Sequence, residues 1–272
     1  MSTITTDSES SALSSIRASF GSWPMDRDFG DVRPFQGLYL AGRRFLAKFQ
    51  DNYVFKFFDD GSEIVEKELR MMILAGDCSV TPLGRIFKDR ELYGIIMTYE
   101  TPIIPPSPDL PYMHLAPPNF SHSDKLRLIN QLRILVSRLH EKGIIHGDIK
   151  PSNLLLCSDD EMRFCDFGDA AVDGEGDIPR AMSVRYSSPF MCKITPSVSL
   201  TKAEDLYATG ISMWEIYIGH IPFADVDDDM IEDVIKSGGR PDITLIDDAV
   251  AAEFIMSYLD CGDRSLHESK ST

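Results

Sequence analysis

Residues 146–156 read HGDIKPSNLLL: a histidine, an aspartate, a lysine and an asparagine fall within eight positions, and an apolar run follows. Asp166 comes thirteen residues after Asn153, within FCDFGDA. The apolar runs NLLLCS and MRFCD flank a short turn at residues 158–160, which predicts a hairpin of two strands. Such a hairpin would bring Asn153 and Asp166 back to the end where Asp148 lies. Three oxygen-bearing side chains would then converge, and hard oxygen ligands suit Mg²⁺ held together with phosphates.

The chain around this stretch divides into a strand-rich half and a helix-rich half. The proline-rich residues 101–120 favour neither a helix nor a central strand, so they mark the boundary. Residues 123–143 have leucines along one side of a helix that Gly143 would end. A further helix is predicted at about 203–218, before Gly219.

In the strand-rich half, one predicted helix carries a carboxylate on its apolar face. Residues 62–75 form the helical pattern, which Gly76 closes. Glu68 lies between Ile64 and Met72 on the apolar side. Because an isolated buried carboxylate is costly, we expect a cationic partner for it. The predicted strands are the runs GLYLAG, RFLAKF and NYVFKFF between residues 36 and 60, then residues 81–87 and 92–99.

Composition narrows the class of protein. The 272 residues carry a net charge of −16, which argues against a broad nucleic-acid-binding face and against anionic membrane surfaces. The five cysteines are scattered without CxxC spacing, so they indicate neither a disulfide framework nor a zinc site. Residues 1–15 lack the apolar centre of a secretory signal, and no run of about eighteen apolar residues predicts a spanning helix. We expect a soluble protein of the cytoplasm or nucleus.

The motifs in residues 146–153 and 166–168 resemble those of the eukaryotic protein kinase family. That family has H-R-D-x-K-x-x-N followed by D-F-G, and this chain has HGDIKPSN and DFG. The resemblance covers roughly residues 36–265. It implies an α+β, bilobal fold with a small β-rich N-lobe that has one helix, and a mainly helical C-lobe. The domain limits expected from it are a disordered Ser/Thr-rich leader at 1–30, the N-lobe at 31–100, the C-lobe at 101–265 and a tail at 266–272.

The resemblance also implies roles for the polar residues. Asp148 would accept the proton of the substrate hydroxyl, and Lys150 would neutralise the transferred phosphoryl group. Asn153 and Asp166 would hold Mg²⁺. Lys56, in YVFK, stands where the family has the lysine of V-A-I-K, and Glu68 follows twelve residues later as its partner. The implied cofactors are ATP and Mg²⁺, and the list of expected nucleotide-binding residues is Lys56, Glu68, Met97 as gatekeeper, Thr98 and Glu100 at the hinge, and Leu155.

Three further motifs extend the resemblance into the second half of the chain. Residues 183–189 (SVRYSSP) are similar to the end of an activation segment, T-x-x-Y-x-A-P. Residues 205–210 (DLYATG) are similar to D-x-W-x-x-G, and residues 219–223 (GHIPF) to G-x-x-P-F. The column of apolar residues that joins the family's lobes would consist of Met72, Leu83, His146 and Phe167 above Asp205.

The chain departs from the family at several positions. Only Gly42 stands where the glycine-rich loop belongs, and Phe190 replaces the glutamate of A-P-E. Gly147 replaces the arginine of H-R-D, a form found in small-molecule phosphotransferases such as aminoglycoside and choline kinases. Those enzymes usually lack the lysine at the place of Lys150 and a segment like 183–189.

Three functions remain open at this point. The first is ATP-dependent phosphoryl transfer to Ser/Thr hydroxyls of a protein substrate, since a lysine two residues past the catalytic aspartate points to Ser/Thr specificity. The second is a pseudokinase scaffold with weak or no catalysis. The third is a small-molecule phosphotransferase. For the first, the expected partner is a protein with a Ser/Thr acceptor, with no nucleic acid or membrane, and the protein is taken as a monomer.

Overall fold

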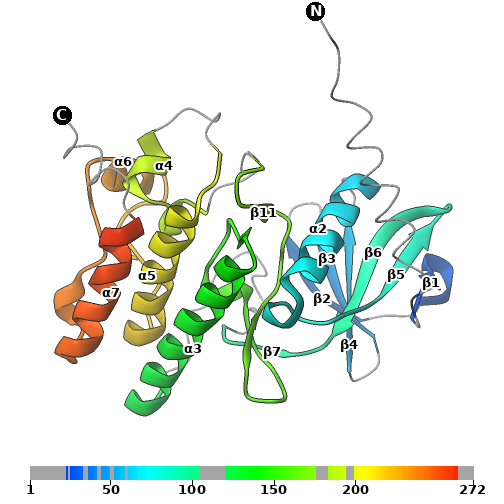
Figure 1. Ribbon diagram of the computed structural model, residues 1–272, viewed down its shortest axis with the longest axis horizontal. Helices are drawn as coiled ribbons and strands as arrows, with labels where there is room; N and C mark the ends of the chain where they lie inside the picture. The colour runs from blue at the N-terminus through cyan, green and yellow to red at the C-terminus, as the bar shows by residue number, and fades with distance from the viewer. Residues whose placement is uncertain are drawn as a thin grey trace, which may run out of the picture.

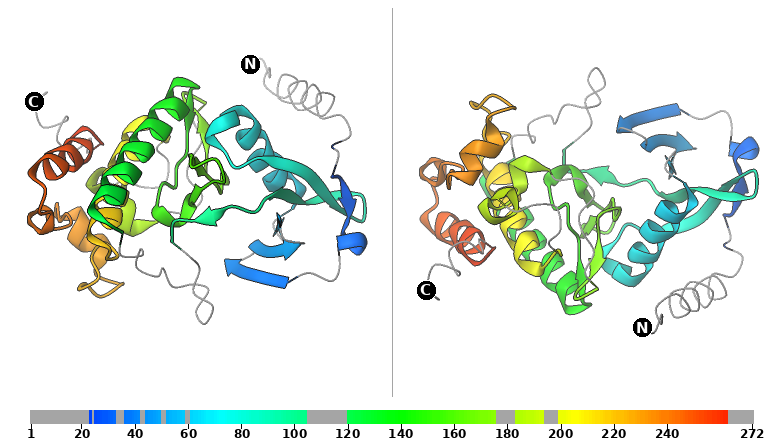
Figure 2. Two further views of the ribbon diagram at one scale, coloured as in Figure 1. Left: turned by 90° about the horizontal axis from the view of Figure 1, so that it is seen from below. Right: turned by 90° about the horizontal axis from the view of Figure 1, so that it is seen from above.

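The computed structural model describes residues 23, 25–32, 36–41, 44–49, 52–58, 61–104, 120–175, 183–193 and 199–262. It shows a sheet-rich N-lobe and a helical C-lobe side by side, with β1 (Arg27–Asp28) and α7 (Ala249–Gly262) at opposite ends of the molecule (Figures 1 and 2). The fold class is therefore the predicted one. Gly42 and residues 266–272 lie outside the described residues.

The N-lobe is a six-stranded sheet with one helix against it. The strand order is β1-β5-β6-β4-β3-β2, and all neighbours are antiparallel except the pair β1 and β5. The bounds are β1 Arg27–Asp28, β2 Gln36–Ala41, β3 Arg44–Phe49, β4 Tyr53–Phe58, α2 Ser62–Ala75, β5 Pro82–Lys88 and β6 Glu91–Thr98, with short 3₁₀ turns η1 Phe29–Val32 and η2 Gly76–Cys78.

Alternation along β4 sorts its side chains onto two faces of the sheet. Phe55 and Phe57 pack in an outer cluster, whereas Lys56 and Phe58 lie on the inner face towards α2. Lys56 therefore points between the lobes because it alternates with two outward phenylalanines.

The C-lobe is built around α5, which is buried along most of its length. Thr201 and Glu204 form a capping box at its start, and Gly219 ends it in the left-handed conformation. The other bounds are β7 Thr101–Pro102, α3 His122–Glu141, β8 Ile144–Ile145, η3 Pro151–Asn153, β9 Leu154–Leu156, β10 Met162–Phe164, β11 Ala171–Val172, η4 Val184–Tyr186, α4 Pro189–Lys193, α5 Lys202–Ile218, α6 Ile231–Lys236, η5 Ile243–Leu245 and α7 Ala249–Gly262. Among the described helices, none is both long and apolar enough to cross a membrane.

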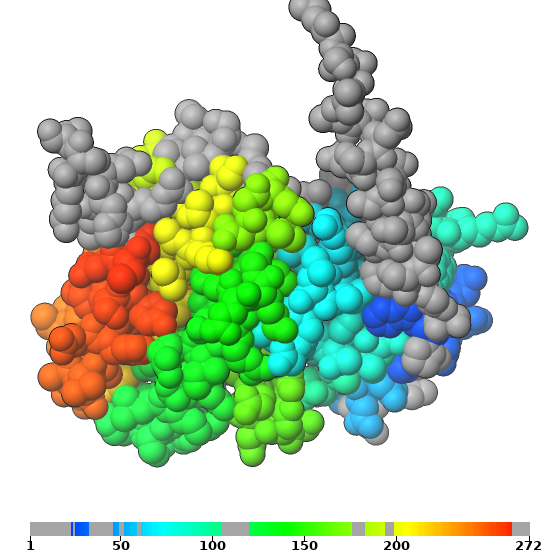
Figure 3. Space-filling model, viewed as in Figure 1, coloured from blue at the N-terminus to red at the C-terminus, as the bar shows by residue number. Residues whose placement is uncertain are grey.

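One hydrophobic core runs through both lobes. Val65 and Leu69 of α2, Leu132 of α3 and Ile211 of α5 belong to the same buried cluster. The surface of α2 (cyan) adjoins that of the C-lobe (green) in Figure 3. This shared core fixes how the two halves of the site face each other.

Two expectations about the N-lobe were wrong. Residues 27–30, which belong to the predicted disordered leader at 1–30, form β1 and the first half of η1, because Phe29 and Val32 cover the outer cluster of the sheet. Residues 1–22 of that leader lie outside the described residues. Leu83 packs with this outer cluster rather than with Met72, because the register of β5 shifts between Pro82 and Gly84 and such a bulge changes the face of a side chain.

Candidate active site

Asp205, near the start of α5, fixes the loop that follows β8 and begins at His146. The carboxylate of Asp205 accepts hydrogen bonds from the backbone N–H groups of His146 and Gly147, at 2.8 and 2.9 Å. Nε2 of His140 lies 2.9 Å from the same carboxylate. Asp205 is 1% exposed, so these hydrogen bonds satisfy a carboxylate that burial would otherwise penalise.

Gly147 occupies a position that accepts no side chain. Its φ is +78°, in the left-handed region that favours glycine. A Cβ built on it would lie 2.6 Å from the carbonyl oxygen of Asp169. The glycine of HGD is therefore required by the close approach of the backbone that follows Asp166.

His146 links this loop to the core. Its ring lies 5.0 Å from that of Phe167, and both residues are fully buried. Burial lowers the pKa of His146, which favours the neutral ring. Nδ1 accepts from the N–H of Asp148 at 3.3 Å, so Nε2 carries the proton and donates to the carbonyl of Cys165 at 3.2 Å.

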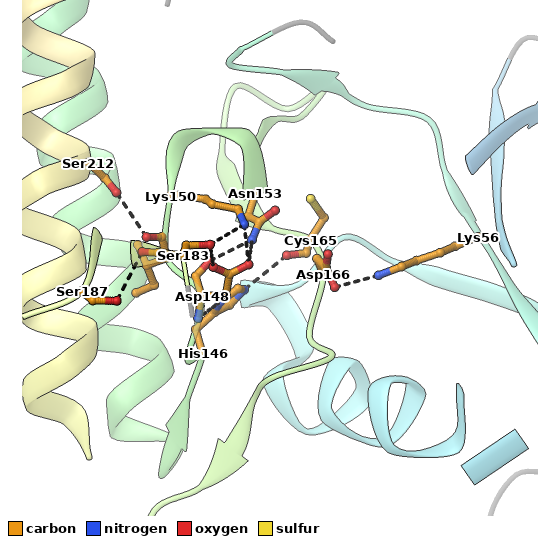
Figure 4. A network of polar contacts seen from close by, with 11 residues as sticks. Lys56, His146, Asp148, Lys150, Asn153, Cys165, Asp166, Ser183, Ser187 and Ser212 are labelled. Carbon is orange, nitrogen blue, oxygen red and sulfur yellow. Dashed lines mark hydrogen bonds and ion pairs between the residues drawn. The ribbon is translucent and has the colours of Figure 1, made fainter. Parts of the chain in front are cut away.

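Three donors converge on the carboxylate of Asp148 (Figure 4). The Nζ of Lys150 lies 2.7 Å from Oδ2, and Nδ2 of Asn153 lies 3.0 Å from the same oxygen. The hydroxyl of Ser183 donates to Oδ1 at 2.6 Å and accepts from Lys150 at 2.9 Å. Lys150, Asn153 and Ser183 thus hold Asp148 in one network.

The predicted hairpin of β9 and β10 brings the second motif to the same place. Leu154 pairs with Phe164, and the N–H of Cys165 donates to the carbonyl of Asn153 at 3.0 Å. Asn153 therefore stands opposite the residue that precedes Asp166. Asp166 has φ +60°, which is uncommon outside glycine and is typical of functional sites.

Lys56 bridges the two lobes. Its Nζ lies 2.5 Å from Oε1 of Glu68 and 2.8 Å from Oδ1 of Asp166. Glu68 is fully buried, and the cation expected for a carboxylate on the apolar face of α2 is thus Lys56. Removing one partner of such a buried pair is strongly destabilising.

The other residues predicted to contact a nucleotide come from β6, from the position of Glu100 after it, and from β9. Met97 is buried on the inner sheet face, opposite Val54, and Thr98 follows it at the end of β6. Leu155 pairs with Pro102, so β7 joins the hairpin of β9 and β10 in a three-stranded sheet. The carboxylate of Glu100 accepts from the N–H of Ser158 at 3.1 Å and so ties the hinge to the turn of the hairpin.

The chemistry of the donors suits a divalent cation. Nδ2 of Asn153 is used to hold Asp148, which leaves Oδ1 as the atom with the character of a ligand. Asp166 adds a carboxylate, and Mg²⁺ takes few protein ligands when phosphates supply others. Within the described residues, no group of three or more His, Cys, Asp or Glu side chains that could hold a metal ion occurs.

Sequence reasoning missed a second buried pair beneath the network. The hydroxyl of Tyr186 donates to Oε2 of Glu215 at 2.6 Å. Burial raises the pKa of Glu215 to about 7, against the lowering effect of the Tyr186 hydrogen bond and of Arg185. Burial, with the negative charge of Glu215, also raises the pKa of Tyr186. A glutamate within the apolar pattern of α5 was the available signal, as it was for Glu68.

The two lobes, the shared core and the network around Asp148 define a domain with the protein-kinase fold. Comparison with known families matches residues 58–253 to the family described as protein kinase domain. The chain therefore belongs to the protein kinase family. The match begins two residues after Lys56 and so leaves out the region of the glycine-rich loop.

Individual relatives agree with this membership. The chain is 30% identical over 166 residues to CBL-interacting serine/threonine-protein kinase 21 of Arabidopsis thaliana, which covers 59% of this chain and 37% of that protein. It is 32% identical over 126 residues to the calcium/calmodulin-dependent protein kinase type II alpha chain of Drosophila melanogaster, covering 44% and 23%. The matched region is thus well under half of either relative.

Proposed function

We propose that this protein transfers the γ-phosphoryl group of ATP, bound with Mg²⁺, to Ser or Thr hydroxyls of a protein substrate. The observation that carries the proposal is the joined network in which Lys150, Asn153 and Ser183 hold Asp148. On the other side, Lys56 links Glu68 to Asp166. Phosphoryl transfer depends mainly on positioning and on stabilising negative charge, and these groups supply both.

Asp148 has the capacity to accept a hydroxyl proton. Three donors reach its carboxylate within the described part of the chain, whereas a carboxylate offers about four lone-pair sites. Oδ1, which accepts only from Ser183 among these donors, can accept a further hydrogen bond from a substrate hydroxyl. Lys150 stands beside it as the cation that offsets the charge of the transferred group.

Asn153 and Asp166 would hold the magnesium ion, and Lys56 would contact the phosphates of the nucleotide. The bound ion neutralises charge on the phosphates and orients them. Glu68 keeps Lys56 extended toward Asp166, so α2 contributes to the site through its buried face.

Two observations favour a protein substrate over a small alcohol. Lys150 and Ser183 both contact Asp148, and the segment that carries Ser183 continues into η4 and α4 beside the catalytic loop. The relatives named above are protein kinases. The name of the first of them, a serine/threonine-protein kinase, also supports Ser/Thr specificity.

The test is transfer of labelled γ-phosphate from MgATP to a mixed peptide array, followed by identification of the phosphorylated amino acid. We expect label on serine and threonine and none on tyrosine. Label on choline or an aminoglycoside, offered in parallel, would place the protein with the small-molecule phosphotransferases. Absence of transfer together with absence of MgATP binding would favour the scaffold.

A further inference from the structure

The short turn η4 carries contacts to three different parts of the C-lobe. Ser183, directly before it, contacts Asp148 and Lys150. Tyr186 at its end contacts Glu215 of α5. The N–H of Tyr186 donates to the carbonyl of Ser183 at 2.8 Å, so the turn behaves as one unit. Whatever holds η4 in place therefore also holds Ser183 on the catalytic loop.

Arg185, between these two residues, extends to the loop after α5. Its Nη1 donates to the carbonyl of Pro222 at 2.6 Å and to that of Phe223 at 3.0 Å. Its Nη2 donates to the carboxylate of Asp228. The Arg185 side chain is 22% exposed and that of Asp228 is 89% exposed. The carbonyl contacts are thus the sheltered part of this interaction, and the ion pair is screened by solvent.

The two accepting carbonyls belong to a fixed piece of backbone. Phe223 has φ +58°, and its ring is buried in a small cluster with Cys192 and Ile231, against which Val184 packs. The cluster joins η4 and α4 to Phe223 and to α6. It therefore ties residues 183–193 to the same loop that Arg185 contacts. A charged donor that bonds carbonyl oxygens is stronger than a neutral one.

We propose that Arg185 is a positioning residue: its guanidinium holds residues 183–193 on the loop 219–228 and thereby keeps Ser183 on Asp148 and Lys150. This role rests on the proposed function for its effect on catalysis. Gly147 offers no side chain to hold the segment from the catalytic loop, and Phe190, where the family has an acidic residue, packs in an apolar cluster with Met191 and Leu200. The anchor is therefore Arg185, which lies within residues 183–193 and contacts the loop 219–228 rather than the catalytic loop.

The test compares Arg185→Gln and Arg185→Lys with the wild-type full chain, with Arg127→Gln on the exposed face of α3 as the matched control. A misplaced catalytic contact can cost about ten- to a hundred-fold in rate. We expect Arg185→Gln to lower kcat for a peptide by about tenfold and to raise the peptide KM, with the KM for ATP unchanged. Arg185→Lys keeps one cationic donor and should recover part of the loss. Arg127→Gln should match the wild type.

Hydrogen exchange separates this proposal from the proposed function. Residues 183–193 should exchange faster in Arg185→Gln, while residues 202–218 of α5 keep their protection, whether or not the protein shows transfer activity. Asp228→Asn should stay close to Asp229→Asn in both measurements, because the ion pair is exposed. Unchanged exchange at 183–193, or an increase spread equally over α5, would overturn the role. Lost activity without local exchange would also do so.

Discussion

Gly147 shows how a single position can be dictated by backbone geometry rather than by chemistry. Its N–H is held by Asp205 at 2.9 Å, and its α-carbon faces the carbonyl of Asp169. The glycine thus lets the catalytic loop pass close to the segment that follows Asp166. A residue that suggested a small-molecule phosphotransferase has, in this chain, a steric explanation.

Replacing Gly147 by alanine should therefore lower stability and activity together. The left-handed φ alone costs about 1–3 kcal/mol for a residue with a Cβ, and the contact with Asp169 adds to this. Gly238 is the matched control, because its φ is +92° but a Cβ there meets nothing within 4 Å. Urea unfolding should show a larger loss for Gly147→Ala than for Gly238→Ala. Equal losses would mean that the backbone of Asp169 moves aside freely.

Glu215 should make stability depend on pH. Burial raises its pKa from the ordinary 4.5 to about 7, so the folded protein binds a proton that the unfolded chain releases in this range. The wild type should accordingly lose stability relative to Glu215→Gln as pH rises from about 4.5 to 7, by up to about 3 kcal/mol. Below that range the difference should be constant. Unfolding free energies of both proteins at pH 5 and 8 measure it, and a difference independent of pH would contradict the assignment.

At the scale of elements, residues 183–193 are held by contacts that need no phosphate. Ser183, the tempting phosphorylation site, uses its hydroxyl to bridge Lys150 and Asp148. Earlier in the same stretch of sequence, the described acidic residues Asp169, Asp173 and Glu175 add negative charge, which disfavours an added phosphate. Asp177, the fourth acidic residue of the segment, lies outside the described residues.

Phosphatase treatment should consequently leave the rate of peptide phosphorylation unchanged. Ser183→Ala should lower the rate because it removes both bridging contacts, and Ser183→Asp should lower it at least as much because it adds a carboxylate beside Asp148. Ser257→Ala on the exposed side of α7 serves as the control. A several-fold loss after phosphatase, restored by phosphorylation within residues 169–190, would show that another cation grips a phosphate there.

The segment 25–32 acts as a cover for the outer face of the sheet. Asp26 accepts hydrogen bonds from the backbone N–H of Arg85 at 2.9 Å and from its guanidinium at 2.6 Å. Burial alone would raise the pKa of Asp26, but the hydrogen bonds from Arg85 lower it. Gly84 permits the approach, because a Cβ there would lie 2.5 Å from the carbonyl of Met25.

Asp26→Ala should lower the melting temperature without greatly changing the kinetic constants. Losing hydrogen bonds that hold a partly buried arginine costs about 1–3 kcal/mol, and the segment lies on the sheet face opposite Lys56. Asp31→Ala, at an exposed position of η1, provides the comparison. Identical melting of the two variants would show that the cover adds little to stability.

Across the whole molecule, the sequence predicted what depends on local pattern and on the family's motifs. Helix α2 lies at the predicted residues 62–75, and the carboxylate on its apolar face does pair with Lys56. The predicted hairpin of β9 and β10 is present, and it brings Asn153 beside Cys165, the residue before Asp166. The helix, the hairpin and the need for a cationic partner follow from periodicity and spacing, and the choice of Lys56 as that partner follows from the family's motifs.

What the sequence did not predict depends on contacts between distant segments. The strand β1 forms only because β5 offers its edge, and nothing in residues 25–32 alone indicates this pairing. The outward position of Leu83 follows from a register shift in β5 that the sequence pattern does not predict. The contacts of Arg185 with the carbonyls of Pro222 and Phe223 join residues that are 37 and 38 positions apart, so no local pattern predicts them.

The most direct test of the account compares wild type and Asp148→Asn for labelled phosphate transfer and for MgATP binding in the same preparation. Asp148 contacts Lys150, Asn153 and Ser183, whereas Lys56 and Asp166 form the side of the site that we propose binds the nucleotide. The variant should lose transfer by about 10²–10⁴-fold, the contribution expected of a general base, and should keep MgATP affinity within about threefold. Transfer by Asp148→Asn at the wild-type rate would contradict the account.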